Sequence, residues 1–137
     1  MEALISNQNV DIVRRSLEAN ARGDIEEMLT YVDPDGELHS AIIGGAEGHV
    51  YRGHDGFRRW YAETDPTFEE LRTELSEFRD LGDRVVGLGQ IHARGRESGV
   101  ELDSATGWVF TLRNGKILTA EGFLSPDEAL EAAGLSE

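Results

Sequence analysis

The sequence contains no cysteine, which excludes a disulfide framework, a thiolate nucleophile and a zinc site with cysteine ligands. Basic residues are also scarce, because 13 lysines and arginines stand against 27 aspartates and glutamates, for a formal charge of −14. A chain with this charge is repelled at long range by nucleic-acid phosphates and by anionic membranes. We therefore expect no nucleic-acid partner and no membrane partner.

Long apolar runs are missing as well. Residues 1–6 contain no basic segment and no apolar stretch long enough for a signal peptide or a membrane span. Together with the absence of cysteine, this indicates a cytoplasmic protein. At 137 residues the chain is long enough to bury a core of its own, and we expect one domain over residues 1–137.

The first third of the sequence predicts two antiparallel helices joined by a tight turn. One apolar face with three- or four-residue spacing is formed by Val10, Val13, Leu17 and Ala21. Asp24 and Glu27 stand three apart, the relation of a capping box, and predict the start of the second helix. Asp33-Pro34 is expected to end it, because the residue before a proline is pushed out of the helical region.

The middle of the chain is harder to interpret. A short strand over residues 36–43 and a glycine-rich loop over residues 44–48 are followed by a third helix, from Asp55 to just before Asp65-Pro66. Residues 67–80 are ambiguous, since their apolar side chains have helical spacing.

The last part of the sequence predicts three strands and a short helix. The strands cover residues 84–94, 100–112 and 116–124. Asn114-Gly115 is the pair that a type I′ hairpin turn needs, since both of its central residues have positive φ. Ser125 with Pro126 has the signature of a helix start. Helices followed by a meander of strands indicate an α+β fold.

Four stretches in this order resemble SnoaL-like domains of the nuclear-transport-factor-two-like superfamily. They are the helical hairpin that ends in YVDPD at 31–35, YRGHDG at 51–56, GDRV at 82–85, and the stretch from NGKI at 114–117 through ALEAAGL at 129–135. The resemblance implies an α+β cone, in which a curved antiparallel sheet wraps around three helices from the N-terminal half and a short helix follows at the C-terminus. It also implies a strand over residues 72–80, a pocket between helices and sheet, and a homodimer through the outer sheet face.

The family register, combined with strand alternation, assigns side chains to the pocket. The expected ligand-pocket residues are Trp60, Trp108, Phe110, Leu118 and Gly122. Stacking on the three aromatic rings suits a flat or alicyclic ligand. The alternative for Trp60 is a plain core position, since its spacing from Phe57 is helical.

The resemblance also indicates which catalytic acidic residues of related enzymes this sequence lacks. The acidic residue that SnoaL-like cyclases and epoxide hydrolases use falls at or near Gly122, and the oxyanion-side aspartate of ketosteroid isomerases corresponds to about Trp108. Neither residue can carry a catalytic proton, so a copy of these mechanisms is not expected.

Other side chains could supply acid–base chemistry. His92 or His39, paired with Glu37, is the candidate general base, and the Gln90 amide could orient a carbonyl group or a water. The alternative is that these strand histidines are surface or hydrogen-bonded residues without a catalytic role. The four histidines have no recognised metal-ligand spacing, so we expect neither a metal nor a cofactor.

Two functions follow, and the sequence leaves both open. The chain is either a cofactor-independent isomerase, cyclase or hydrolase of a hydrophobic small molecule, or a dimeric protein that binds such a ligand without chemistry. A weaker third possibility is a scaffold whose pocket is filled by Trp108.

Overall fold

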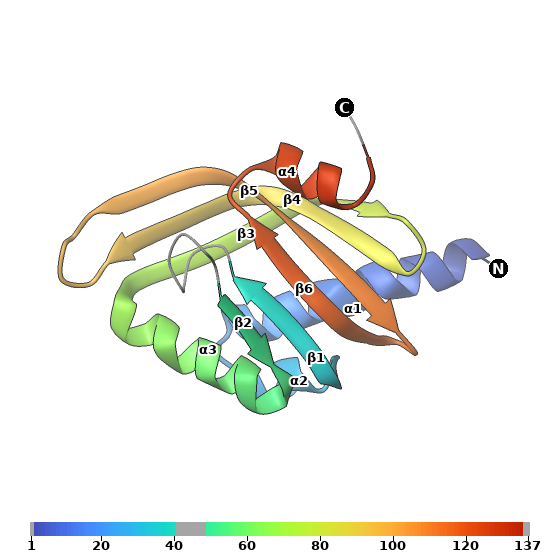
Figure 1. Cartoon of the computed structure of the whole chain (residues 1–137), viewed down its shortest axis with the longest axis horizontal. Coiled ribbons are helices and arrows are strands. Elements are labelled where there is room, and N and C mark those ends of the chain that lie inside the picture. The colour runs from blue at the N-terminus through green and yellow to red at the C-terminus, as the bar shows by residue number, and fades with distance from the viewer. Residues whose placement is uncertain (1, 41–48, 136–137) are drawn as a thin grey trace.

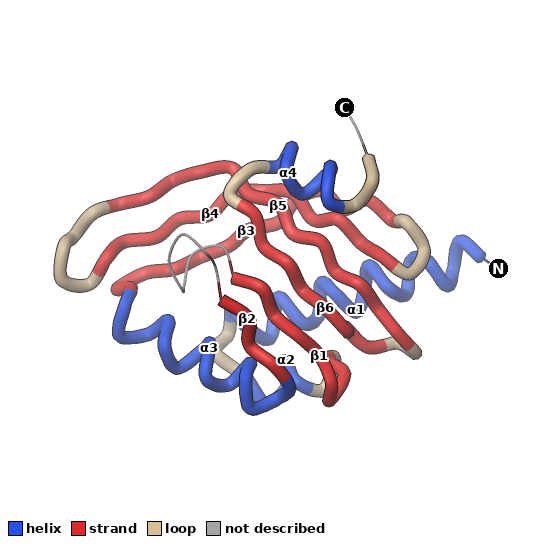
Figure 2. Tube along the Cα trace, viewed as in Figure 1, coloured by secondary structure: helices blue, strands red, loops and turns tan. Residues whose placement is uncertain are grey.

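The computed structural model describes residues 2–40 and 49–135. In chain order its elements are α1 (Glu2–Ala21), α2 (Ile25–Leu29), β1 (Val32–Ser40), β2 (His49–Arg52), α3 (Gly53–Thr67), β3 (Phe68–Asp80), β4 (Arg84–Gly95), β5 (Glu101–Arg113), β6 (Lys116–Phe123) and α4 (Pro126–Ala132). The strands form one curved sheet in the order β2-β1-β6-β5-β4-β3 (Figures 1 and 2). Helices α1, α2 and α3 lie on one face and α4 on the other, which confirms the expected α+β fold.

The sheet is mixed rather than wholly antiparallel. β1 pairs with β6 in parallel, with Leu38 opposite Ala120, whereas all other neighbours are antiparallel. This pairing places a strand from the first third of the chain beside the last strand. The inner face therefore combines residues from both halves of the sequence.

The second helix is shorter than the sequence predicts. It is capped by Asp24, whose carboxylate accepts a hydrogen bond from the backbone N–H of Glu27, as expected. It ends at Leu29, however, and Pro34 already lies within β1. Proline is tolerated there because the β1–β6 pairing is irregular between Val32 and Glu37, where no regular ladder N–H is required.

The third helix is longer than predicted, because α3 continues past Asp65-Pro66 to Thr67. Pro66 removes one hydrogen bond, in the last turn of the helix, where only Thr67 follows, so the bias against helix before proline does not prevail. The strand β2, which the sequence reading missed, precedes this helix. The predicted loop at residues 44–48 and the last residues of the predicted first strand, 41–43, lie outside the described residues.

Residues 68–80 form an edge strand, against their helical spacing. The resemblance implied a strand over residues 72–80, and the observed strand begins four residues earlier. Two cores lie on opposite faces of the sheet. The larger one packs α1, α2 and α3 against the inner face, around residues such as Val13, Tyr51 and Phe110. The smaller one packs α4 on the outer face, where Val86 and Val109 contact it. None of the helices in the described part of the chain is long and apolar enough to cross a bilayer.

The β3–β4 pair bends at a bulge, which curves this end of the sheet over the helices. The register shifts between Leu75 and Glu77, and Gly89 lies opposite Leu75. An ideal Cβ on Gly89 would lie 1.9 Å from the carbonyl oxygen of Glu74. The bend therefore requires a residue without a side chain at this position.

We predict that Gly89→Ala lowers the free energy of unfolding by about 3 kcal/mol, because the new methyl group meets backbone that cannot move without breaking the ladder. Urea denaturation measures the change. Gly99→Ala is the control, since its φ of 70° is unfavourable for alanine but its Cβ would meet nothing within 4 Å. The control should lower the free energy of unfolding by only about 1–2 kcal/mol. Equal losses for both variants would contradict the backbone contact as the cause.

Candidate functional site

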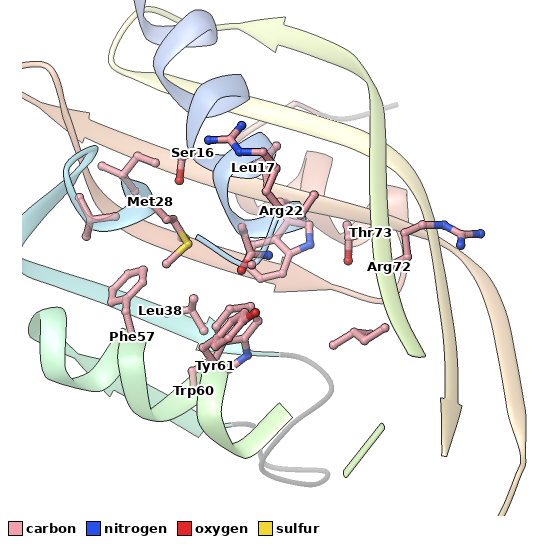
Figure 3. Close-up of a pocket in the computed structure, with 18 of the residues that line it drawn as sticks. Ser16, Leu17, Arg22, Met28, Leu38, Phe57, Trp60, Tyr61, Arg72 and Thr73 are labelled. Atoms are coloured by element: carbon pink, nitrogen blue, oxygen red, sulfur yellow. The ribbon is translucent and has the colours of Figure 1, made fainter. Parts of the chain in front are cut away.

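A cavity of about 470 Å³ lies between the helices and the inner face of the sheet (Figure 3). Residues of α1, α2, α3 and four strands line it. Its apolar walls are built mainly by Leu17, Met28, Leu38, Phe57, Trp60, Leu71, Trp108, Phe110 and Ile117. Leu38, Phe57, Trp60 and Tyr61 project from β1 and α3 toward Met28 on the opposite wall (Figure 3).

Two stacked aromatic rings form one wall. Trp108 and Phe110 stand two residues apart on β5 and so point to the same face. Their ring centroids are 5.9 Å apart and their planes differ by 14°. Trp60 also lines the cavity, from α3, so both tryptophans of the chain face this space. The arrangement offers flat, polarisable surfaces to a ligand.

Gly122 makes room for the Trp108 indole. The two residues are direct cross-strand partners, and an ideal Cβ on Gly122 would lie 2.7 Å from the indole Cζ2. The position where the resemblance expected an acidic residue is thus closed to any side chain unless the ring moves. Beyond Trp108, a second small cavity of about 30 Å³ is lined by residues that include Gly122, Thr106 and Ile91.

Polar side chains line the main cavity from several elements. Ser16 and Asn20 lie one turn apart and both line it, together with Tyr61 of α3 and Thr73 of β3. The side-chain oxygen of Asn20 is buried and has no hydrogen-bond partner among the described residues. Sequence reading missed this group. The signal was present, since Ser16 and Asn20 interrupt a buried helix face, and a buried polar residue is more informative than a buried apolar one.

Acid–base groups are scarce in this lining. Among the described residues that form it there is no histidine, and Glu69 is the single carboxylate. Glu69 is exposed and its carboxylate lies 3.5 Å from the Arg94 guanidinium. The described walls of the cavity therefore hold no buried carboxylate or imidazole that could move a proton.

Glu37 and His39 lie on the outer face of the sheet, away from the cavity. Leu38 between them is buried and lines the cavity, so its neighbours point the other way. His39 Nε2 donates to Glu37 Oε1 at 3.2 Å, and Arg52 Nε donates to Glu37 Oε2 at 3.3 Å. These hydrogen bonds, that from His39 first, hold the pKa of Glu37 below its ordinary value. The three side chains form a cluster at the β1–β2 pair, in which Glu37 and His39 are partly buried and Arg52 is exposed.

Gln90 and His92 also point outward. Ile91 between them is 4% exposed and lines the small cavity. His92 Nδ1 contacts the carboxylate of Asp103, its cross-strand neighbour on β5. The expected inward orientation of the four polar candidates is thus corrected to outward, and Glu37–His39 and Gln90–His92 remain on separate strands.

The alternating pattern of residues along β4 did not show which side chains point inward, because both faces of this strand are covered. On the outer face Val86 and Leu88 pack against α4, while two of the inner positions are Gly87 and Gly89. Hydrophobicity therefore gives no period-2 signal that distinguishes inside from outside.

Leu118 does not line the cavity either. The β5–β6 register shifts between Thr111 and Leu112, so the inward positions of β6 are Ile117 and Ala120. Of the five expected pocket residues, Trp60, Trp108 and Phe110 line the main cavity, and Gly122 lines the small one.

Comparison with known proteins relates this architecture to a family. A family model described as a SnoaL-like domain matches residues 13–120. Among curated proteins, none matches the chain. A nuclear-transport-factor-two-like protein of unknown function from Burkholderia pseudomallei is 25% identical, with a TM-score of 0.77 over 90% of this chain and 95% of that one.

Two further solved structures are similar. TerC, co-crystallized with polyporic acid, is 25% identical, with a TM-score of 0.76 over 90% of this chain and 96% of TerC. A Xanthomonas campestris protein described as a candidate polyketide cyclase is 19% identical, with a TM-score of 0.72 over 90% of this chain and 95% of that one. The last likeness shows the fold alone.

We predict that Gly122→Ala lowers the free energy of unfolding by about 2 kcal/mol, because the methyl group displaces a packed indole. The emission spectrum of Trp108 should shift in the same variant. Trp108→Phe supplies the control, since a smaller ring leaves room for the methyl group. Adding Gly122→Ala to Trp108→Phe should therefore cost much less than adding it to the wild type. Additive losses would show that the two residues do not constrain each other.

Proposed function

The chain belongs to the SnoaL-like domain family, and from this premise we propose that it binds a flat, apolar small molecule in the main cavity, without acid–base chemistry. Family membership supports a small-molecule binding or cyclase/isomerase role in general. The observation that carries the narrower proposal is the lining itself, which combines stacked aromatic walls with the absence of a buried carboxylate or imidazole among its described residues.

The size of the cavity supports this proposal. A volume of about 470 Å³ lies within the range of roughly 300–1,000 Å³ that small-molecule pockets occupy. Planar rings gain most from such walls, since aromatic faces favour offset stacking, worth about 0.5–1.5 kcal/mol per pair beyond the buried area. TerC, one of the similar structures, was co-crystallized with polyporic acid, which makes this compound a suitable first probe.

Catalysis is the second candidate, and the geometry supports it less. General acid–base catalysis needs a proton-transfer group within about 3 Å of the reacting atom. The expected bases, His39 and His92, lie on the outer face, where they contact Glu37 and Asp103. A ligand held between Trp60 and Trp108 would be separated from them by the sheet.

We predict that polyporic acid and β-naphthol bind to the wild-type protein and that Ala21→Phe weakens both by at least tenfold. Ala21 lines the cavity and is exposed at the last residue of α1, so a phenyl group there should occupy the cavity entrance without disturbing the core. Titration calorimetry measures the affinity, and quenching of Trp60 and Trp108 reports occupancy of the cavity.

Ala132→Phe is the matched control. Ala132 is also exposed and is the last residue of its helix, α4, but it lies on the opposite face of the sheet. This variant should bind both probes as the wild type does. Absence of binding by the wild type, or equal binding by the Ala21→Phe variant, would refute the proposed site.

The homodimer remains a prediction from the resemblance. It would use the outer face of β6, where Thr119 and Glu121 lie beyond the cover of α4. We expect sedimentation equilibrium to give the mass of two chains, and Thr119→Arg to shift it toward one because the larger cation cannot be buried at the contact. Thr30→Arg, exposed at the end of α2, is the control. A single-chain mass for the wild type at micromolar concentration would contradict the dimer.

A further inference from the structure

We propose that Trp108 is a specificity-determining residue that sets the length of the ligand, because its indole ring closes the main cavity on the side of the small one. The ligand class is thereby narrowed to flat apolar molecules that end at this ring, and longer members of the same class are excluded. This inference rests on the proposed function, since it concerns the ligand of the same cavity.

The two cavities follow one another along the same strands of the sheet. Leu38 of β1 and Ala120 of β6 line the main cavity. Ser40 and Gly122, two residues further along these strands, line the small one. Two residues of a strand span about 7 Å, and their side chains point to the same face. The small cavity is therefore the next space along the inner face, and a ligand that extended along the sheet would enter it.

Trp108 lies between the two spaces and lines both of them. Along β5, Phe110 on one side of it lines the main cavity, and Thr106 on the other side lines the small one. The other residues that line both cavities belong to α3 and to the edge strand β3, and they are Trp60, Leu71 and Thr73. Trp108 is thus the residue of the central strands that separates the cavities.

The neighbouring strands supply no side chain at the level of Trp108. Its direct cross-strand partners are Gly122 on β6 and Gly87 on β4. Of these three central strands, only β5 therefore carries a side chain at this level. A smaller residue at position 108 would leave the inner face of the three strands open here and would join the two cavities.

The indole ring is held in place, so that it acts as a fixed wall. Its centroid lies 5.9 Å from that of the Phe110 ring, on which it stacks. On Gly122, an ideal Cβ would lie only 2.7 Å from the indole Cζ2, so the ring rests on the backbone of β6. A longer ligand can enter the small cavity of the wild type only if the ring turns aside and both contacts are lost.

The test measures how long a ligand the protein accepts. The probes are β-naphthol and derivatives that carry a linear alkyl chain, from methyl to octyl, at the end of the ring system opposite the hydroxyl group. Each buried methylene group should tighten binding about fourfold. In the wild type we expect this gain to stop at the chain length that reaches Trp108, and titration calorimetry shows where it stops.

Trp108→Leu should move this limit to chains that are longer by about two carbon atoms or more, since a large-to-small substitution leaves a cavity. That space is continuous with the small cavity of about 30 Å³. Trp108→Phe keeps an aromatic ring on Phe110 and should move the limit in the same direction by less. This milder variant carries the test where Trp108→Leu does not fold.

Phe110→Leu is the matched control. Phe110 stacks on Trp108 and lines the main cavity, but it does not line the small one. This variant also loses an aromatic wall, so it should weaken the binding of the whole series. It should leave the limit at the wild-type chain length, because the passage to the small cavity stays closed.

Ile91→Phe tests the far side of the passage. Ile91 lines the small cavity from β4 and does not line the main one. In the Trp108→Leu background, the larger side chain should fill the small cavity and return the limit toward the wild-type length. In an otherwise wild-type chain, Ile91→Phe should leave the limit unchanged, because the probes do not reach this space.

The outcomes separate this inference from the proposed function. The same limit in the wild type, Trp108→Phe and Trp108→Leu overturns the role of Trp108 and leaves cavity binding intact. An equal shift in Phe110→Leu, or a wild type without any limit up to the octyl chain, overturns it as well, because the ligand would then not end at this ring. Failure of β-naphthol, its derivatives and polyporic acid to bind the wild type overturns the proposed function and this inference together.

Discussion

The contact between Trp108 and Gly122 determines which side chains can line the cavity of this protein. An indole ring lies so close to the Cα of its cross-strand partner that no side chain fits between them. The ring is held against Phe110 and forms a flat wall, and the cavity extends from this wall to α1 and α3. At this pair of residues, the indole ring occupies the space that an acidic side chain at position 122 would need. The cavity therefore has an aromatic surface there instead of a carboxylate.

The local signals in the sequence were reliable where a single residue type is required by backbone geometry. Asp24 and Ser125 cap the helices that follow them, because their side chains each accept a hydrogen bond from the backbone N–H group three residues on. Asn114 and Gly115 adopt positive φ in the β5–β6 turn. These features depend only on neighbouring residues, so the order of the C-terminal strands and the last helix could be predicted.

Orientation within the sheet could not be predicted in the same way, because it depends on what packs on each face. On β4 the outer Val86 and Leu88 are covered by α4 and the inner Gly87 and Gly89 carry no side chain, so the usual alternation is absent. On β6 a register shift moves Ile117 rather than Leu118 to the inside. The three aromatic residues expected in the pocket line the main cavity, whereas the polar candidates lie on the outer face of the sheet.

The two faces of the sheet carry different kinds of polar group. The histidines that could act as bases lie outside, where each contacts a carboxylate at the surface. Apart from the exposed Arg22, Glu69 and Arg72, the polar side chains that line the cavity carry amide or hydroxyl groups, which bind and orient a ligand but do not exchange protons near neutral pH. The aromatic walls of the cavity are therefore suited to selecting a molecule by its shape.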